Sequence, residues 1–189
     1  MVDPAVAVLA AGRGVRFGGH KLETACAGKP LGRWAIDAVE AAGLERGTIV
    51  TGPGGVSFAD GWYALANPDP AAGIGSSLAL AALDALASGA TSMLVLLADM
   101  PLVTADYLRE LAGCAPPVAT RYPGWSYGVP AVLDLALIEQ ASRLTGDRGA
   151  GALLTAVPGI AFRTPDPAML RDVDTPEDLA EVERQLLAR

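Results

Sequence analysis

The feature that most constrains the fold is an uninterrupted apolar run over residues 93–98, which ends at Asp99. A strand with one face in water alternates apolar and polar residues, whereas such a run is typical of a strand buried on both faces. Strands buried on both faces belong to parallel sheets that helices cover from either side. Strand-like and helix-like stretches also alternate along most of the chain, which favours the same architecture.

The sequence therefore predicts an α/β fold, a three-layer αβα sandwich with a Rossmann-like, mostly parallel sheet. Short strand-like segments on either side of a turn at residues 122–125 predict an antiparallel edge. We expect a single domain over residues 1–189, because 189 residues can bury one sizeable core. The predicted strands are 5–9, 47–51, 62–66, 93–98, 118–121, 129–133 and 160–163. The predicted helices are 30–42, 78–87 after a cap at Ser76 and Ser77, 105–112, 135–144, a short helix ending at 155, and a last one capped by Thr175.

The chain is acidic overall, with a net charge of −7 at pH 7, but its first part is basic. Residues 1–33 contain five basic and two acidic side chains, a local charge of +3. Positive charge focused on an acidic protein points to a small polyanionic ligand rather than to nucleic acid. No apolar stretch is long enough to span a membrane and no signal-peptide pattern is present, so we expect a cytoplasmic protein without membrane contact.

The basic segment contains a glycine-rich loop, residues 9–21, directly after the first predicted strand. Glycines let backbone N–H groups approach an anion closely, and basic side chains add positive charge. The spacing G-x-G-x-x-x-G differs from the dinucleotide-binding pattern G-x-G-x-x-G, and the Gly-Lys-Ser/Thr of a Walker-type loop is absent. The pattern alone leaves an anion-binding loop and a plain surface loop as alternatives. The basic residues of the loop are Arg13, Arg16 and Lys21.

Asp99 follows the buried strand directly, and ligands of open parallel sheets bind beyond the carboxyl ends of the strands. A charge in that place predicts a binding role, whereas the alternative is a turn former or a helix cap. Thr104 competes with Asp99 for the capping of the helix at 105–112. Two further carboxylates, Asp172 and Asp174, precede the last helix, and helix capping explains residues 175–178 but not these two.

The loop resembles the signature of the MobA-like nucleotidyltransferases, L-A-(A/G)-G-x-S-x-R-(M/F)-G-x-x-K. Gly14 stands where the family usually has serine. Ala11, in place of a second glycine, resembles the branch of the molybdenum cofactor cytidylyltransferases, and its methyl group leaves less room for a purine base. Further family-like segments follow in the same order at residues 28–31, 73–78, 99–101, 146–150 and 172–176. The matching loop positions are Leu9, Ala10, Ala11, Gly12, Arg16, Phe17, Gly18 and Lys21.

The resemblance implies a fold like that of the nucleotide-diphospho-sugar transferases, and an enzyme that moves NMP from an NTP to a phosphate-bearing acceptor and releases pyrophosphate. It favours CTP over GTP and implies molybdopterin or the molybdenum cofactor as acceptor. It also implies Mg²⁺ as cofactor, and a molybdoenzyme or its chaperone as a further partner. The acceptor phosphate is already ionised, so positioning and charge neutralisation suffice without a protein nucleophile.

The same resemblance implies the site residues, with the nucleotide in the N-terminal half and the acceptor in the C-terminal half. Catalytic roles fall on Arg16, Lys21 and Asp99, and metal binding falls on Asp99 and Asp174. The implied nucleotide-binding residues are Leu9, Ala10, Ala11, Gly12, Arg13, Gly14, Arg16, Lys21, Asn67, Gly73, Ser76 and Ser77. The implied acceptor-binding residues are Tyr127, Gly128, Pro130, Gly146 and Asp147.

Two departures from the family pattern fall in the acceptor half. Val129 stands where many members have histidine, and Gly151 stands where they have arginine, which weakens the expected grip on an acceptor phosphate. Three alternatives stay open: a sugar-phosphate nucleotidyltransferase, a NAD(P)- or flavin-dependent oxidoreductase, and a non-catalytic cofactor-binding partner protein. The presence of Arg16, Lys21 and Asp99 together argues against the non-catalytic alternative.

Overall fold

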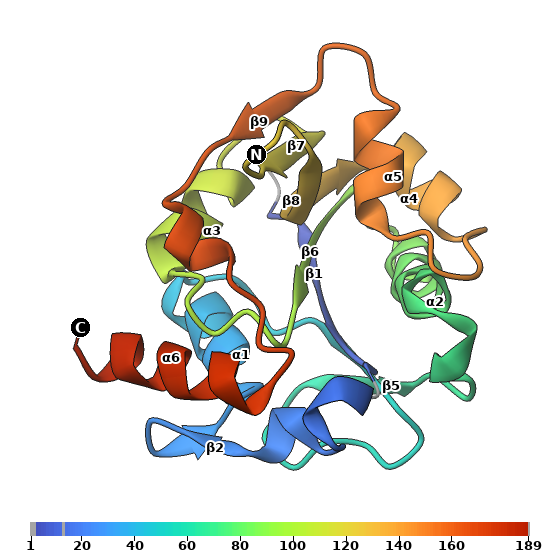
Figure 1. Cartoon of the computed structure of the whole chain (residues 1–189). Helices are drawn as coiled ribbons and strands as arrows, with labels where there is room; N and C mark the ends of the chain where they lie inside the picture. Colours follow the sequence, from blue (N-terminus) through green and yellow to red (C-terminus); the bar gives the residue numbers. More distant parts are fainter. Residues whose placement is uncertain (1–2, 13, 189) are drawn as a thin grey trace.

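The computed structural model describes residues 3–12 and 14–188, so the predicted role of Arg13 lies outside the described residues. In these residues seven strands form one sheet in the order β5-β4-β1-β6-β8-β7-β9, and helices cover both of its faces (Figure 1). This arrangement confirms the predicted three-layer α/β fold. The strands of the sheet are β1 (Ala5–Ala10), β4 (Thr48–Thr51), β5 (Tyr63–Ala66), β6 (Ser92–Leu97), β7 (Val118–Arg121), β8 (Tyr127–Asp134) and β9 (Ala161–Arg163).

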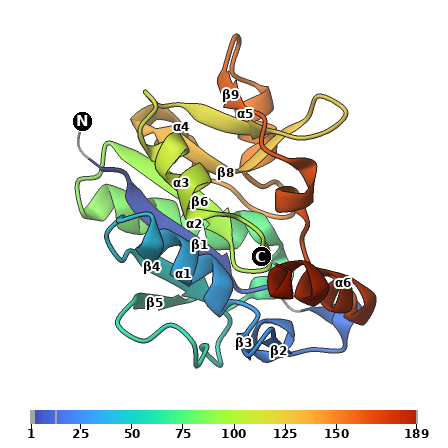
Figure 2. The ribbon, with the colours of Figure 1, turned by 90° about the vertical axis from the view of Figure 1, so that its left-hand side faces the viewer.

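Two layers of helices enclose the sheet, and a hydrophobic core lies under each. One face carries α1 (Arg33–Ala41), α3 (Ala105–Ala112) and α6 (Pro176–Leu187) (Figure 1, Figure 2). The other face carries α2 (Ile74–Ala87), α4 (Leu135–Ala141) and α5 (Ala150–Thr155). None of the helices in the described part of the chain has the length and hydrophobicity that crossing a membrane requires.

The strand directions place most carboxyl ends at one edge of the sheet. β1 pairs in parallel with β4 and β6, and β9 pairs in parallel with β7. β8 runs antiparallel to both β6 and β7, so β7 and β9 point the same way as β1 and β6. The carboxyl ends of β1, β6, β7 and β9 therefore share one edge, and ligands of such sheets bind beyond that edge.

The helix predicted from residue 30 begins three residues later, at Arg33. Residues 29–30 instead form β3 (Lys29–Pro30), which pairs with β2 (Ala25–Cys26) in a small separate hairpin. The turn of this hairpin is held from α6, because the amide of Ala27 donates a hydrogen bond to Glu183 Oε1 at 2.7 Å. The predicted start is wrong because residues 29–30 pair with β2, in a hairpin that a contact from the far end of the chain supports.

The helix predicted from residue 78 begins at Ile74, with Gly73 as its N-cap. Ser76 and Ser77 therefore lie in the first turn and do not cap the helix, which corrects the prediction. The hydroxyl of Ser76 donates a hydrogen bond back to the carbonyl oxygen of Gly73 at 2.7 Å. The predicted cap of the last helix is confirmed, since Thr175 forms a capping box at the start of α6.

Gly47 lies directly before β4, where the neighbouring strand leaves no room for a side chain. A Cβ atom at Gly47 would lie 2.0 Å from the carbonyl oxygen of Val6 in β1. We expect Gly47→Ala to lower the free energy of unfolding by about 3 kcal/mol, because the two strands must move apart. A urea titration measures this loss, with Gly54→Ala as the matched control, since a Cβ atom there meets nothing within 4 Å. Equal losses in the two variants would contradict this packing.

Candidate active site

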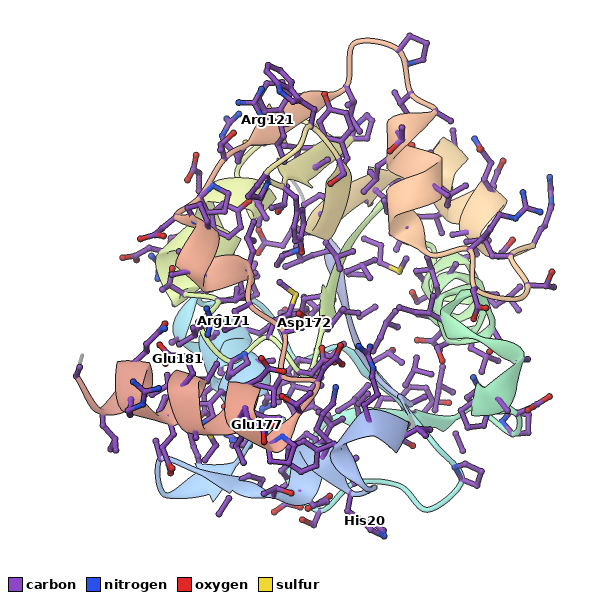
Figure 3. All side chains as sticks on the ribbon, viewed as in Figure 1. His20, Arg121, Arg171, Asp172, Glu177 and Glu181 are labelled. Carbon is purple, nitrogen blue, oxygen red and sulfur yellow. The ribbon has the colours of Figure 1, made fainter. Side chains whose placement is uncertain are left out.

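The glycine-rich loop leaves β1 at the carboxyl edge and folds back through two short 3₁₀ turns, η1 (Val15–Phe17) and η2 (Lys21–Glu23). Gly14 has a left-handed backbone with φ 56°, and a Cβ atom there would lie 3.1 Å from Cβ of Lys21. This glycine, where the family usually has serine, therefore permits the turn that brings Lys21 back to the strand end. His20 in the same loop is exposed and points outward (Figure 3).

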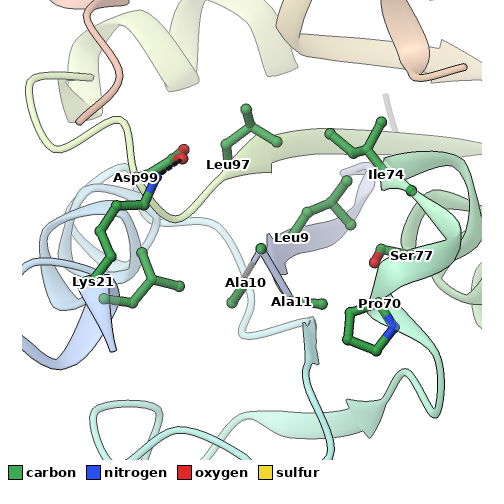
Figure 4. Close-up of a pocket in the computed structure, with 12 residues that line it drawn as sticks. Leu9, Ala10, Ala11, Lys21, Pro70, Ile74, Ser77, Leu97 and Asp99 are labelled. Carbon is green, nitrogen blue, oxygen red and sulfur yellow. Dashed lines mark hydrogen bonds and ion pairs between the residues drawn. The ribbon is translucent and has the colours of Figure 1, made fainter. Parts of the chain in front are cut away.

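Lys21 is buried, with 7% of its side chain exposed, and its ammonium group lies between two carboxylates. Lys21 Nζ is 2.8 Å from Asp99 Oδ2 (Figure 4) and 3.4 Å from Asp174 Oδ1. The guanidinium group of Arg16 is exposed, and its Nη2 is 2.6 Å from Asp174 Oδ2. The structure thus brings together the four residues with predicted catalytic or metal-binding roles.

Backbone contacts set the positions of the two carboxylates. Asp99 comes soon after the end of β6, at the carboxyl edge of the sheet. The amide of Val173 donates a hydrogen bond to the carbonyl oxygen of Asp99 at 3.0 Å, which ties the segment before α6 to this edge. The amide of Asp174 in turn donates to Asp178 Oδ2 at 3.2 Å, within the capped start of α6. Asp99 and Asp174 are therefore held side by side although they are far apart in the sequence.

One carboxylate oxygen of this cluster has no partner. Asp99 Oδ1 is buried and accepts no hydrogen bond from any described residue. A buried oxygen without a donor costs free energy, and a bound cation would satisfy it. Asp172 lies nearby, where partial burial and then the negative charges of Asp99 and Asp174 raise its pKa. Helix capping left Asp172 unexplained in the sequence, and the structure makes it a third carboxylate close to Lys21.

The donors of this cluster fit a cation that prefers oxygen ligands. Mg²⁺ is bound through one or two carboxylates together with substrate phosphates, so Asp99 and Asp174 match its requirements. Among residues 3–12 and 14–188, no group of three or more His, Cys, Asp and Glu side chains is arranged to hold a metal. Asp99 and Asp174 therefore have the oxygen donors that part of such a site needs, and a ligand would have to supply the rest.

A first cavity, of about 140 Å³, lies between the loop and the start of α2 (Figure 4). Lys21 and Asp99 lie at one end of it, and Pro70 and Ser77 lie at the other. Apolar side chains and glycines make up most of its lining, which suits a flat ring better than a charged group. The predicted nucleotide-binding residues that line it are Leu9, Ala10, Ala11, Gly12, Lys21, Gly73 and Ser77.

Asn67 supports the wall of the first cavity that α2 provides. Its side chain is 2% exposed, and Nδ2 donates to the hydroxyl oxygens of Ser76 at 2.9 Å and Ser77 at 3.0 Å. Its Oδ1 accepts a hydrogen bond from the amide of Asp69 at 3.0 Å. Neither Asn67 nor Ser76 lines the first cavity, but Asn67 holds Ser77, which does.

The five residues predicted to bind the acceptor fall in two places. Gly146 and Asp147 lie against the start of α2, because the amide of Gly75 donates to the carbonyl oxygen of Gly146 at 2.9 Å. A Cβ atom at Gly73 would lie 2.5 Å from Asp147 Oδ1, so Gly146 and Asp147 pack behind Gly73, which lines the first cavity, and do not line it themselves. The other three lie in β8, and they are Tyr127, Gly128 and Pro130.

Gly151, one of the two departures from the family pattern, has a packing explanation. A Cβ atom there would lie 2.8 Å from the carbonyl oxygen of Tyr127, so a larger side chain would push α5 away from β8. A Cβ atom at Gly128 would likewise lie 2.8 Å from Cε2 of Tyr122. Val129, the other departure, lies in the same strand as Gly128.

A glycine-rich loop, buried positive charge and acidic residues at the carboxyl edge of a mostly parallel sheet together define a phosphate-binding α/β protein. The particular family follows from comparison with known families: residues 6–160 match the MobA-like NTP transferase domain, and the chain belongs to that family. The chain is thus a nucleotidyltransferase. This finding sets aside the oxidoreductase and the non-catalytic alternatives.

Individual relatives agree with the family over almost the whole chain. The purine catabolism protein PucB of Bacillus subtilis is 26% identical over 195 residues, which cover 94% of this chain and 95% of that protein. A nucleotidyl transferase from Methanothermobacter has the same fold, with a TM-score of 0.81 and 21% identity over 100% of this chain and 99% of that one. The molybdopterin-guanine dinucleotide biosynthesis protein A of Archaeoglobus fulgidus gives a TM-score of 0.67 and 19% identity over 98% and 100% of the two chains.

Proposed function

We propose that this enzyme transfers CMP, in preference to GMP, from the NTP to molybdopterin or the molybdenum cofactor and releases pyrophosphate. One observation carries the proposal: the buried ammonium group of Lys21 lies between the carboxylates of Asp99 and Asp174 at the carboxyl edge. When the substrate binds, the triphosphate can replace the carboxylates as the partner of Lys21, and a divalent cation can replace Lys21 as the partner of the carboxylates. We further propose that the single domain acts in the cytoplasm and that a molybdoenzyme or its chaperone receives the product.

The first cavity supports the placement of the nucleotide. Ala11 lines it, and the methyl group takes up space that a purine would need, which favours the smaller cytosine ring. Ser77 offers a hydroxyl group to the ribose or the base, and Asn67 holds that hydroxyl in place. Gly12 and Gly14 keep the loop open to the phosphates, with Arg13 as a further cation in the same loop.

The charged cluster supports the chemical step. An ionised oxygen of the acceptor phosphate forms a bond to the α-phosphorus of CTP, and the bond from that phosphorus to the bridging oxygen of pyrophosphate breaks. Pyrophosphate leaves with the electron pair, and Arg16 and Lys21 neutralise its growing charge. Mg²⁺, held by Asp99 and Asp174, would supply further charge neutralisation at the phosphates when it is bound.

The acceptor is proposed to lie on the side of β8, where the C-terminal half of the chain faces the reacting phosphates. Tyr127, Gly128 and Pro130 lie in that strand, and Gly146 and Asp147 pack against the start of α2. In this placement the two halves of the chain meet at Asp99, between the nucleotide and the acceptor.

A thermal-shift experiment with CTP, GTP, ATP, UTP and NAD(P)H, each with and without Mg²⁺, tests the nucleotide. At about a hundred times its Kd, CTP with Mg²⁺ is expected to stabilise the protein by about 2.7 kcal/mol, a shift of roughly 5–10 °C. Without Mg²⁺ we expect a smaller shift, because Lys21 cannot turn to the phosphates without leaving the carboxylate of Asp99 without its cation, whereas Asp174 keeps Arg16. A larger shift with GTP would contradict the base preference, and a shift with NAD(P)H alone would contradict the proposed reaction.

A further inference from the structure

A second cavity, of about 310 Å³, opens at the ends of β7 and β9, formed by residues of 121–125 and 164–170. These strands end at the same edge of the sheet as β1 and β6, because β8 alone runs the other way in this part of the described sheet. Ligands of open α/β sheets bind beyond this edge. The first cavity covers the end of β1, so the second cavity offers the other half of the same edge to a second substrate.

Arg121 is the charged side chain that lines the second cavity. Its guanidinium carbon is 4.5 Å from the ring centroid of Trp125 and 4.3 Å from that of Phe162. Among the described residues it forms no ion pair with a carboxylate. Aromatic rings over a guanidinium group leave the N–H groups at its rim free, and these bind anions in the plane of the group. Arg121 is therefore a positioned cation whose charge no acidic side chain neutralises.

Trp125 presents an aromatic surface at the mouth of the second cavity. Its side chain is 77% exposed, which is unusual for a residue of this size and hydrophobicity. Its backbone has φ 68°, a conformation that is costly for a bulky residue. The protein thus holds a large apolar ring in solvent beside Arg121. A flat conjugated ring is the kind of ligand that stacks on such a surface.

Tyr122 connects the second cavity with the charged cluster. Its side chain lines the cavity, and its hydroxyl group donates to the carbonyl oxygen of Val129 at 2.5 Å. The same oxygen is 4.0 Å from the sulfur of Met100, the residue that follows Asp99. In the view of Figure 3, Asp172 lies between Arg121 and the loop that carries His20. Tyr122 therefore contacts both the second cavity and the residue that follows Asp99.

We propose that the second cavity binds the acceptor through a planar conjugated ring, which stacks on Trp125, while Arg121 binds an anionic group that the acceptor carries. The inference rests on the proposed function, and it names the chemical class of acceptor that the enzyme selects. A sugar phosphate has no planar conjugated ring and lies outside this class.

The experiment measures the binding of carboxypterin, a planar and anionic probe, by the quenching of its own fluorescence in the absence of nucleotide. Trp125→Gly removes the stacking surface and also relieves the left-handed backbone, so we expect a stable fold and a Kd about tenfold weaker or more. Arg121→Gln is expected to weaken carboxypterin binding by a similar factor of about ten, but to leave the binding of unsubstituted pterin unchanged. Melting temperatures show whether each variant is folded.

Tyr63→Ala and Arg143→Gln are the matched controls, since each removes an exposed side chain of the same kind outside the second cavity. Both should bind carboxypterin as the unchanged protein does. Absence of millimolar binding by the unchanged protein, or equal binding by all four variants, would overturn the proposal. The nucleotide does not enter this measurement, so its outcome is separate from that of the thermal shift with CTP and Mg²⁺.

Discussion

Asp99→Ala is expected to reduce the rate of nucleotidyl transfer by about a hundredfold or more in a protein that remains folded. The substitution removes one proposed metal ligand, whose buried Oδ1 has no partner among the described residues, and the carboxylate that lies closest to Lys21. Lys21 keeps Asp174 as a partner at 3.4 Å, so its charge is not left alone in the folded protein. The measurement is pyrophosphate release from CTP and Mg²⁺ with molybdopterin as acceptor.

Asp106→Ala is the matched control for Asp99→Ala. The side chain of Asp106 is 92% exposed and pairs with Arg109 in α3, away from the charged cluster, so its loss should leave turnover unchanged. A titration with Mn²⁺ in the presence of CTP separates binding from chemistry, because Asp99→Ala should weaken the binding of the ion. Turnover of Asp99→Ala near that of Asp106→Ala would remove Asp99 from the mechanism.

Lys21→Met is expected to lower turnover by about a hundredfold or more, because it removes the buried charge that we propose neutralises the leaving pyrophosphate. It also removes the cation that lies between Asp99 and Asp174, so the free energy of unfolding should fall by about 2 kcal/mol near neutral pH. The partial exposure of both carboxylates, 21% and 30%, keeps this loss below that of a fully buried ion pair. Pyrophosphate release and urea titrations measure the two effects.

The stability loss of Lys21→Met should depend on pH with a definite sign. Burial and the neighbouring carboxylates raise the pKa of Asp172, whereas Lys21 opposes that rise, so the variant raises it further. A raised carboxyl pKa favours the folded state only while the group is protonated, so the deficit should grow as the pH rises above about 4. Lys29→Met is the matched control, because Lys29 pairs with Asp37 outside this cluster. An equal loss in both variants, or a loss independent of pH, would contradict the role of Lys21 as the shared cation.

The sequence alone predicted the layers of the fold and most of its strands, because a buried strand can be recognised from a local run of apolar residues. It also pointed to the loop and to Asp99, since a charge after an apolar strand and glycines beside basic residues are local features. The starts of α1 and α2 were predicted wrongly, because contacts with residues outside each helix influence where it begins. The first turn of α2 is held by a distant residue, because the amide of Gly75 donates a hydrogen bond to the carbonyl oxygen of Gly146 at 2.9 Å. No pattern within residues 74–78 carries that information.

Tertiary structure alone decided how the chemistry is assembled. Lys21 and Asp174 are 153 residues apart in the sequence. They lie 3.4 Å from each other because the segment before α6 is held at the sheet edge by the hydrogen bond from Val173 to Asp99. Tertiary contacts also place Asp172 beside Asp99, and they form the second cavity, whose walls come from a hairpin and from the segment before α6. Residue types and short-range periodicity determine which elements form and what each can do. The distances between charges depend on long-range contacts, which the order of residues does not display.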